Sequence, residues 1–121
     1  MTNKKIIISN YLKDLGIPVS CKGFHYLRYG VELMINDISL MNAITTCLYP
    51  EIAKRFNTGH QNIERCIRHA IATGWSRGNR VTQEKLFGYT VDENLGMPTN
   101  SEFIVTVADY YCMTESEDAN T

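Results

Sequence analysis

Polar side chains that can hydrogen-bond to base edges recur between residues 61 and 69 of this 121-residue chain. At about 100° per residue, the outer side of one helix would carry Gln61, Asn62, Glu64, Arg65, Arg68 and His69. Arginine pairs well with guanine, glutamine or asparagine with adenine, and glutamate accepts a hydrogen bond from cytosine. A lone residue of any of these types on a helix would more often simply face water. Together they predict a base-reading surface on a helix near residues 59–73.

The opposite side of the same helix is apolar, which predicts that it packs against a core. Its residues follow helical spacing and are Ile63, Cys66, Ile67, Ala70 and Ile71. Upstream, Pro50 suits the first turn of a short helix whose residues Ile52, Ala53 and Phe56 face inward. The Asn-Thr-Gly sequence at 57–59 then supplies a tight break. Two helices joined by such a short glycine-containing turn form a helix-turn-helix.

The start of the second helix should also attract a phosphate. Thr58 and Gln61 have the spacing of a capping box, so this helix is expected to begin near Gly59. Its free N–H groups and the positive end of its dipole would then face the DNA backbone. Lys54 and Arg55 on the first helix, with Arg77 farther along the chain, are the remaining candidates for DNA contact.

The net charge of −1 hides an uneven distribution along the chain. Residues 1–50 carry five bases and three acids (+2), and residues 51–85 carry seven bases and three acids (+4). Residues 86–121 carry seven acids and no base (−7). A basic block centred on the helix-turn-helix is the electrostatic footprint that a DNA-binding face needs. The acidic end is expected to be a solvated tail, with contact to a partner as the alternative.

Apolar residues at helical spacing elsewhere in the chain predict an all-α fold. Beyond the helix-turn-helix, helices are expected over residues 4–15, 24–35, 40–48 and 83–87, and from 99 onward. The last begins with a capping box of Thr99 and Glu102 and buries Phe103, Ile104, Val107, Tyr110 and Tyr111. A looser region is expected after residues 74–78, of which Trp75 should anchor the core, and residues 89–98 are expected to form a loop. We therefore predict one compact domain of six or seven helices over residues 1–113 and an acidic, disordered tail over 114–121.

Other kinds of chemistry find little support in the sequence. The cysteines form no CxxC pair and no disulfide or zinc framework, so reduced thiols in the core are expected at Cys21, Cys47, Cys66 and Cys112. Cys66 and His69 would face different sides of their helix, and no fourth zinc ligand follows from the sequence. No glycine-rich or oxyanion-forming motif accompanies a nucleophile, so we expect neither an enzyme nor a metal or other cofactor. Without a membrane span or signal peptide, a cytoplasmic protein is expected.

Many short strings of this sequence match one known family. They lie at residues 22–23, 26–28, 48–50, 52–54, 56–58, 64–65, 67–71, 75–79, 86–91 and 98–104. The most specific are IRHAI at 67–71 and PTNSEFI at 98–104. On these strings the chain, from about Ile8 to Tyr111, closely resembles the DNA-binding effector domain of the master sporulation response regulator of endospore-forming Firmicutes.

The resemblance implies an all-helical transcription regulator that binds a short TGNCGAA-like box in double-stranded DNA, often as tandem head-to-tail copies. It also implies contact with RNA polymerase sigma factor through the C-terminal region. Base reading carries over to Glu64 and Arg65, with Arg68 and His69 beside them at the DNA. Asn62 stands where the family commonly has arginine, and residues 59–61 replace a small polar stretch. Contacts at the start of the recognition helix are therefore expected to differ.

We expect this protein to lack the receiver domain that restrains DNA binding in full-length relatives. Met1 and the charged leader Thr2–Lys5 favour a free-standing paralogue over an excised domain. Such a chain is expected to bind DNA without phosphorylation, because a restraint between two domains requires both. It should be a monomer in solution and a DNA-dependent tandem homodimer on adjacent boxes, paired through residues 100–112 and neighbouring loops. The alternative function is an interaction protein that pairs with a full-length regulator or with sigma factor through its acidic C-terminal third.

Overall fold

The computed structural model describes residues 3–88 and 96–119, with side chains up to residue 115. Its elements in order are α1 (Lys4–Asp14), α2 (Lys22–Asn36), the 3-10 helix η1 (Ile38–Asn42), the π-helix η2 (Ile44–Leu48), α3 (Tyr49–Arg55), α4 (His60–Arg77), α5 (Arg80–Phe87) and α6 (Asn100–Ala119). Within those ranges every element is a helix, which confirms the all-α prediction. The six α-helices among these residues also agree with the predicted number.

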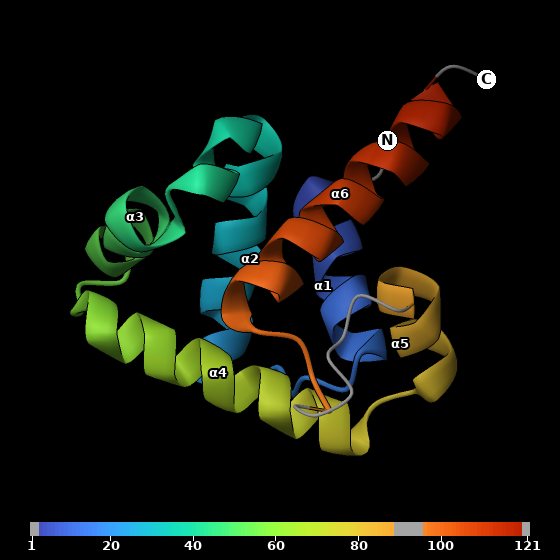
Figure 1. Ribbon diagram of the computed structural model, residues 1–121, viewed down its shortest axis with the longest axis horizontal. Helices are drawn as coiled ribbons and strands as arrows, with labels where there is room; N and C mark the ends of the chain where they lie inside the picture. The colour runs from blue at the N-terminus through green and yellow to red at the C-terminus, as the bar shows by residue number, and fades with distance from the viewer. Residues whose placement is uncertain (1–2, 89–95, 120–121) are drawn as a thin grey trace.

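Helix α2 lies at the centre of the domain and packs against α1, α3, α4 and α6 (Figure 1). Its inward residues, Phe24, Leu27, Val31 and Met34, are at most 1% exposed. At Gly23 the backbones of α2 and α4 touch, because a Cβ atom there would lie 2.3 Å from the carbonyl oxygen of Cys66. This close contact fixes the side of α4 that faces the core, and hence the side that faces solvent.

Helix α4 runs along one edge of the molecule, with α3 beside its N-terminal end and α5 beyond its C-terminal end (Figure 1). Helix α6 begins above α4 and runs away from it, so its C-terminal end lies far from α4 (Figure 1). The predicted apolar face of α4 is confirmed, since Ile63, Ile67, Ala70 and Ile71 are each 0% exposed. Only Cys66 of that face is half-buried.

The prediction of one α-helix over residues 40–48 is wrong. The chain forms a 3-10 helix and then a π-helix, separated at Ala43, whose φ of −140° and ψ of 38° are not helical. The π-helix ends against Pro50, whose ring would collide with the carbonyl of Thr46 in a continuous α-helix and has no N–H to offer it. The wider turn relieves this clash. Ile44 and Leu48 are buried as predicted, but Cys47 is exposed.

Helix α4 does not end near residue 73 as predicted but continues to Arg77. Tertiary packing supports the last turn: Gly74 lies against Leu15 and Ile17, and the Trp75 ring contacts the rings of Phe87 and Phe103 at centroid distances of 4.9 and 6.2 Å. Trp75 thus packs against the core as expected, although it is only partly buried. After α4, the Asn79 side chain caps α5, which begins three residues before the predicted Gln83.

The capping box at the start of α6 is confirmed, because the Thr99 N–H donates to Glu102 Oε1 (2.9 Å) and the Glu102 N–H to Thr99 Oγ1 (3.2 Å). Phe103, Ile104 and Val107 are fully buried, whereas the predicted members Tyr110 and Tyr111 are half-buried. The structure differs from the prediction of a disordered tail, since residues 114–119 continue the helix. The predicted loop over 89–98 lies outside the described residues except for 96–98.

The cysteines are free, but they are not core thiols as predicted. Cys47 is exposed, and Cys21, Cys66 and Cys112 are half-buried. Cys66 has the spacing of the apolar face of α4, but periodicity alone does not separate half-buried from buried positions. In the part of the chain that the structure describes, no helix is long and apolar enough to cross a membrane.

Candidate nucleic-acid interface

The turn between α3 and α4 is built by Asn57, which adopts a positive φ of 54°. Asparagine is one of the few residues other than glycine that tolerates this left-handed conformation. The turn is closed by hydrogen bonds from Thr58 N–H to the Ala53 carbonyl (2.9 Å) and from Asn57 N–H to the Lys54 carbonyl (3.4 Å). This pattern is the Schellman motif that ends a helix. Helices α3 and α4 with this turn therefore form the predicted helix-turn-helix.

The predicted capping box of Thr58 and Gln61 is not formed. Gly59 is the N-cap of α4, with an extended backbone and no side chain that accepts from the first turn. Thr58 Oγ1 instead accepts a hydrogen bond from Asn62 Nδ2 (3.0 Å) and does not cap the first turn of α4. The first N–H groups of α4 consequently remain open to an external acceptor, as the helix N-termini of anion-binding proteins do.

The outward face of α4 carries most of the residues that were predicted to read DNA. Gln61, Arg65, Arg68 and His69 are exposed, and Asn62 and Glu64 are intermediate. All six side chains belong to the first three turns of the helix, on the side away from the buried apolar stripe. The structure thus gathers these predicted site residues on one surface, which we call the α4 outer face.

Asn62 is the centre of a hydrogen-bond network on this face. Its Oδ1 accepts from Arg65 Nη2 (2.8 Å) and from the Cys66 thiol (3.6 Å), while its Nδ2 donates to Thr58. The amide oxygen therefore accepts two hydrogen bonds and the amide nitrogen donates one inside the protein, and the oxygen holds the guanidinium of Arg65 along the helix. Sequence reasoning missed this function of Asn62 and Thr58, although their i, i+4 spacing places the two side chains together.

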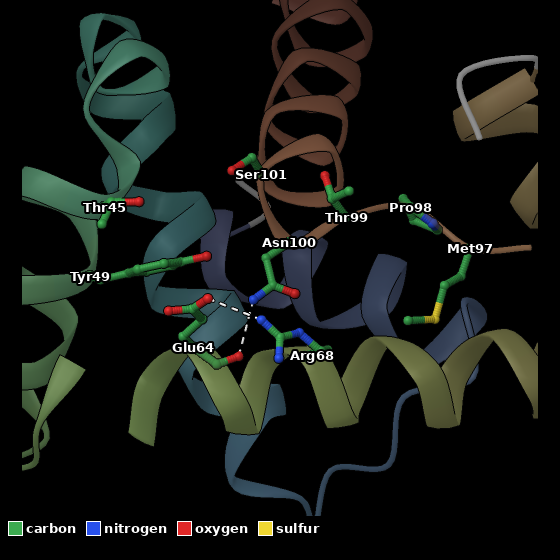
Figure 2. Close-up of a pocket in the computed structure, with 9 residues that line it drawn as sticks. All are labelled: Thr45, Tyr49, Glu64, Arg68, Met97, Pro98, Thr99, Asn100 and Ser101. Carbon is green, nitrogen blue, oxygen red and sulfur yellow. Dashed lines mark hydrogen bonds and ion pairs between the residues drawn. The ribbon is translucent and has the colours of Figure 1, made fainter. Parts of the chain in front are cut away.

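Glu64 and Arg68 form an ion pair one turn apart, with Arg68 Nη2 lying 3.0 Å from Glu64 Oε1 (Figure 2). The side chains are 43% and 61% exposed, so solvent screens the pair. Pairs of this kind in helices contribute only about 0.3–0.5 kcal/mol to stability. A nucleic acid could therefore separate the two side chains at little cost.

A hollow of about 390 Å³ lies beside this ion pair, between α4 and the start of α6 (Figure 2). Its lining residues are Thr45, Tyr49, Glu64, Arg68, Met97, Pro98, Thr99, Asn100 and Ser101. Asn100 Nδ2 donates to the backbone carbonyl of Glu64 (3.0 Å), and Tyr49 lines the same hollow. Burial raises the pKa of Tyr49, and the charge of Glu64 adds to that rise, whereas the polar side chain of Asn100 and the charge of Arg68 oppose it.

Tyr49 and Asn100 were not among the predicted site residues, although the sequence holds a signal for Asn100. It precedes Phe103, Ile104 and Val107 by three, four and seven residues, which places it on the buried face of α6. A polar residue at the head of an apolar stripe indicates a buried amide that needs partners.

A second hollow of about 440 Å³ lies between α4 and the start of α2. Cys21, Lys22, Gly23, Arg65, Cys66 and His69 line it. Lys22 is exposed and brings a further positive charge to the edge of the α4 outer face. Sequence reasoning missed Lys22, because nothing in the sequence pattern indicates that the start of α2 lies against α4.

The remaining predicted contacts do not all join the α4 outer face. Lys54 and Arg55 are exposed on α3, and the Arg55 guanidinium lies 5.9 Å from the ring centroids of both Tyr29 and Phe56. Arg77 is exposed in the last turn of α4, about 24 Å along the helix axis from Gln61 at 1.5 Å per residue. The structure therefore separates Arg77 from the other candidates.

The arrangement combines exposed cations, amides and a carboxylate on one helix with an uncapped helix N-terminus, and it suits binding to a polyanion rather than covalent chemistry. Within residues 3–88 and 96–115, no three His, Cys, Asp or Glu side chains are grouped as metal ligands. In a comparison with protein families, the family model "Sporulation initiation factor Spo0A C terminal" matches residues 8–111, which is nearly the whole chain.

Proposed function

The chain belongs to the family of the Spo0A C-terminal domain, a family of DNA-binding regulators of sporulation transcription and not of enzymes, and we propose that it reads a short TGNCGAA-like box through α4. The observation that supports this proposal most is the division of α4 into two faces. One face is apolar and fully buried against α2, and the other exposes Gln61, Arg65, Arg68 and His69. A recognition helix needs such a division, because its inner face must hold it while its outer face enters the major groove.

Arg65 and Glu64 are the proposed base readers. Arg65 is exposed at the middle of the α4 outer face and can offer a guanine two parallel N–H donors. The Glu64 carboxylate can accept from a cytosine amino group once Arg68 turns toward the DNA. In this proposal Arg68 and His69 contact the DNA beside these two, and Gln61 lies at the helix start, where it is exposed.

Asn62 has a different role in this proposal from a direct base contact. Its oxygen accepts from Arg65, and its nitrogen donates to Thr58. An arginine side chain loses up to about 2 kcal/mol of rotamer entropy when it is ordered, and a fixed partner reduces that loss at the moment of binding. Asn62 therefore pre-orients Arg65 for its base. This accounts for an asparagine at a position where relatives commonly carry arginine.

Backbone contacts would come from the edges of the site. Lys54 and Arg55 on α3 and Lys22 at the start of α2 are exposed on elements that pack against α4. The uncapped N–H groups at the start of α4 can also donate hydrogen bonds to a phosphate, although they carry no formal charge. Such contacts fix the position of the protein on the duplex but carry no sequence information. Arg77, far along α4, would at most touch a separate phosphate.

Two finer features complete the proposal. Adjacent boxes would be occupied by a tandem homodimer that forms only on DNA, since Phe103, Ile104 and Val107 of α6 are fully buried in the core and are not available for pairing. The protein partner would be RNA polymerase sigma factor, reached through the C-terminal region.

In vitro selection from random duplex DNA tests the proposed function. The purified chain should enrich a TGNCGAA-like box, and the Arg65→Ala variant should enrich a box with one guanine less strictly defined. Enrichment of no sequence at all, with retention of a full-length regulator or sigma factor on the immobilised chain, would favour the interaction protein instead.

A further inference from the structure

Asn100 is the one buried polar side chain among the residues whose side chains the structure describes, with 8% of its surface exposed. Burial of an amide without hydrogen bonds costs about 1–3 kcal/mol by mutational measures. A leucine at this position would continue the apolar stripe of Phe103, Ile104 and Val107 without that cost. The position therefore calls for an explanation in terms of the partners of the amide.

The partner of this amide lies in the second helix of the helix-turn-helix. Asn100 Nδ2 donates to the backbone carbonyl of Glu64 in α4 (3.0 Å), across 36 positions of sequence. Tyr49, the first residue of α3 and only 4% exposed, lines the same hollow as Asn100. Figure 2 shows the hydrogen bond between the Asn100 amide and the Glu64 backbone, so one amide in α6 holds the start of α4.

The residue of α4 that accepts this hydrogen bond matters for function. It is Glu64, which directly precedes Arg65 in the sequence and whose side chain pairs with Arg68 (Figure 2). The capping box of Thr99 and Glu102 fixes the first turn of α6 and with it the direction of Asn100. Contacts with α6 as well as with α2 therefore fix how the first turns of α4 are rotated about the helix axis and where they lie along it. Base reading tolerates little error in these quantities, because each bidentate contact depends on donor and acceptor geometry.

We propose that Asn100 is a positioning residue for sequence recognition, which acts through the backbone of Glu64 and does not touch DNA itself. It sets the orientation of the recognition helix against the C-terminal helix. This inference rests on the proposed function, and it assigns that site a specificity determinant from outside the helix-turn-helix.

The test compares the specificity ratio, which is the Kd for a scrambled duplex divided by the Kd for the selected box. Asn100→Asp keeps the shape but loses the donor to Glu64, and Asn100→Leu removes the same donor without adding a charge. Asn10→Asp, at an exposed position of α1, is the matched control for the added negative charge. Circular dichroism at the assay temperature establishes that each variant is folded.

Asn100→Asp and Asn100→Leu should each lower the specificity ratio by about 3- to 10-fold, as expected for a lost hydrogen bond of about 0.5–1.5 kcal/mol. Asn10→Asp should leave the ratio unchanged. A purely structural role would lower the folded fraction and weaken both duplexes equally, so an unchanged ratio in folded Asn100→Asp and Asn100→Leu would overturn the inference. A wild-type ratio near one would instead remove the proposed function, and this inference with it.

Discussion

Replacement of Arg65 by alanine should weaken binding to the box while leaving binding to scrambled DNA nearly unchanged. Arg65 is exposed and donates a hydrogen bond to Asn62 Oδ1 (2.8 Å). Its loss should change the free energy of unfolding by no more than about 0.5 kcal/mol. A bidentate contact to guanine discriminates by about 1–3 kcal/mol, so the Kd for the box should rise by about 5- to 150-fold.

Fluorescence anisotropy with labelled duplexes at one fixed salt concentration measures both Kd values. Arg80→Ala is the matched control, because Arg80 is an exposed arginine on α5, away from the α4 outer face. It removes the same charge and should affect box and scrambled duplex equally. If Arg65→Ala also weakened the two duplexes to the same extent, Arg65 would be a phosphate contact and its assignment as a base reader would be wrong.

Other predictions concern charge, assembly, packing and pH. Each protomer should neutralise about three to five phosphates, so log K should fall with log salt at a slope of about −3 to −5, and a slope near zero would argue against DNA. Sedimentation should find a monomer without DNA, and footprinting should find tighter binding per box on two-box than on one-box duplexes; a stable free dimer would contradict this. Gly23→Ala should destabilise the fold by at least about 1–3 kcal/mol in urea unfolding, because its Cβ would lie 2.3 Å from the Cys66 carbonyl oxygen, and an unchanged midpoint would contradict that packing. Burial raises the pKa of Tyr49 above 10.0, so the folded state keeps this proton at a pH where the unfolded state loses it. The free energy of unfolding should therefore fall as the pH rises above 10. Urea unfolding at several pH values measures this fall, and Tyr49→Phe should remove part of it.

The helices that pack along a continuous stripe were predictable from the sequence. In α4, Ile63, Ile67 and Ile71 repeat every four residues, and burial of this stripe determines which side chains remain outside. The capping box of Thr99 and Glu102 also followed from local spacing, because both of its hydrogen bonds join residues three positions apart. The outward location of the candidate DNA contacts on α4 follows from the same periodicity.

Features that depend on contacts between distant segments were not predictable. Thr58 has the spacing of a capping box with Gln61, yet its hydroxyl oxygen accepts from the Asn62 amide. The backbone N–H of Gln61 and the side chain of Asn62 compete for this oxygen, and the sequence does not show which of them binds it. The last turn of α4 persists past Gly74 because Trp75 packs on Phe87 and Phe103. The bond between Asn100 and Glu64 spans 36 positions, so it exists only after the chain has folded.

The central claim, that the α4 outer face reads the sequence of a box, is tested most directly by nuclear magnetic resonance titration of the isotope-labelled chain. Spectra are recorded with the box duplex and with a scrambled duplex of equal length. The differences between the two titrations should be largest at Glu64, Arg65 and Arg68, with Lys54 responding alike to both duplexes. Equal spectra for the two duplexes, or differences confined to α5 or α6, would contradict the account.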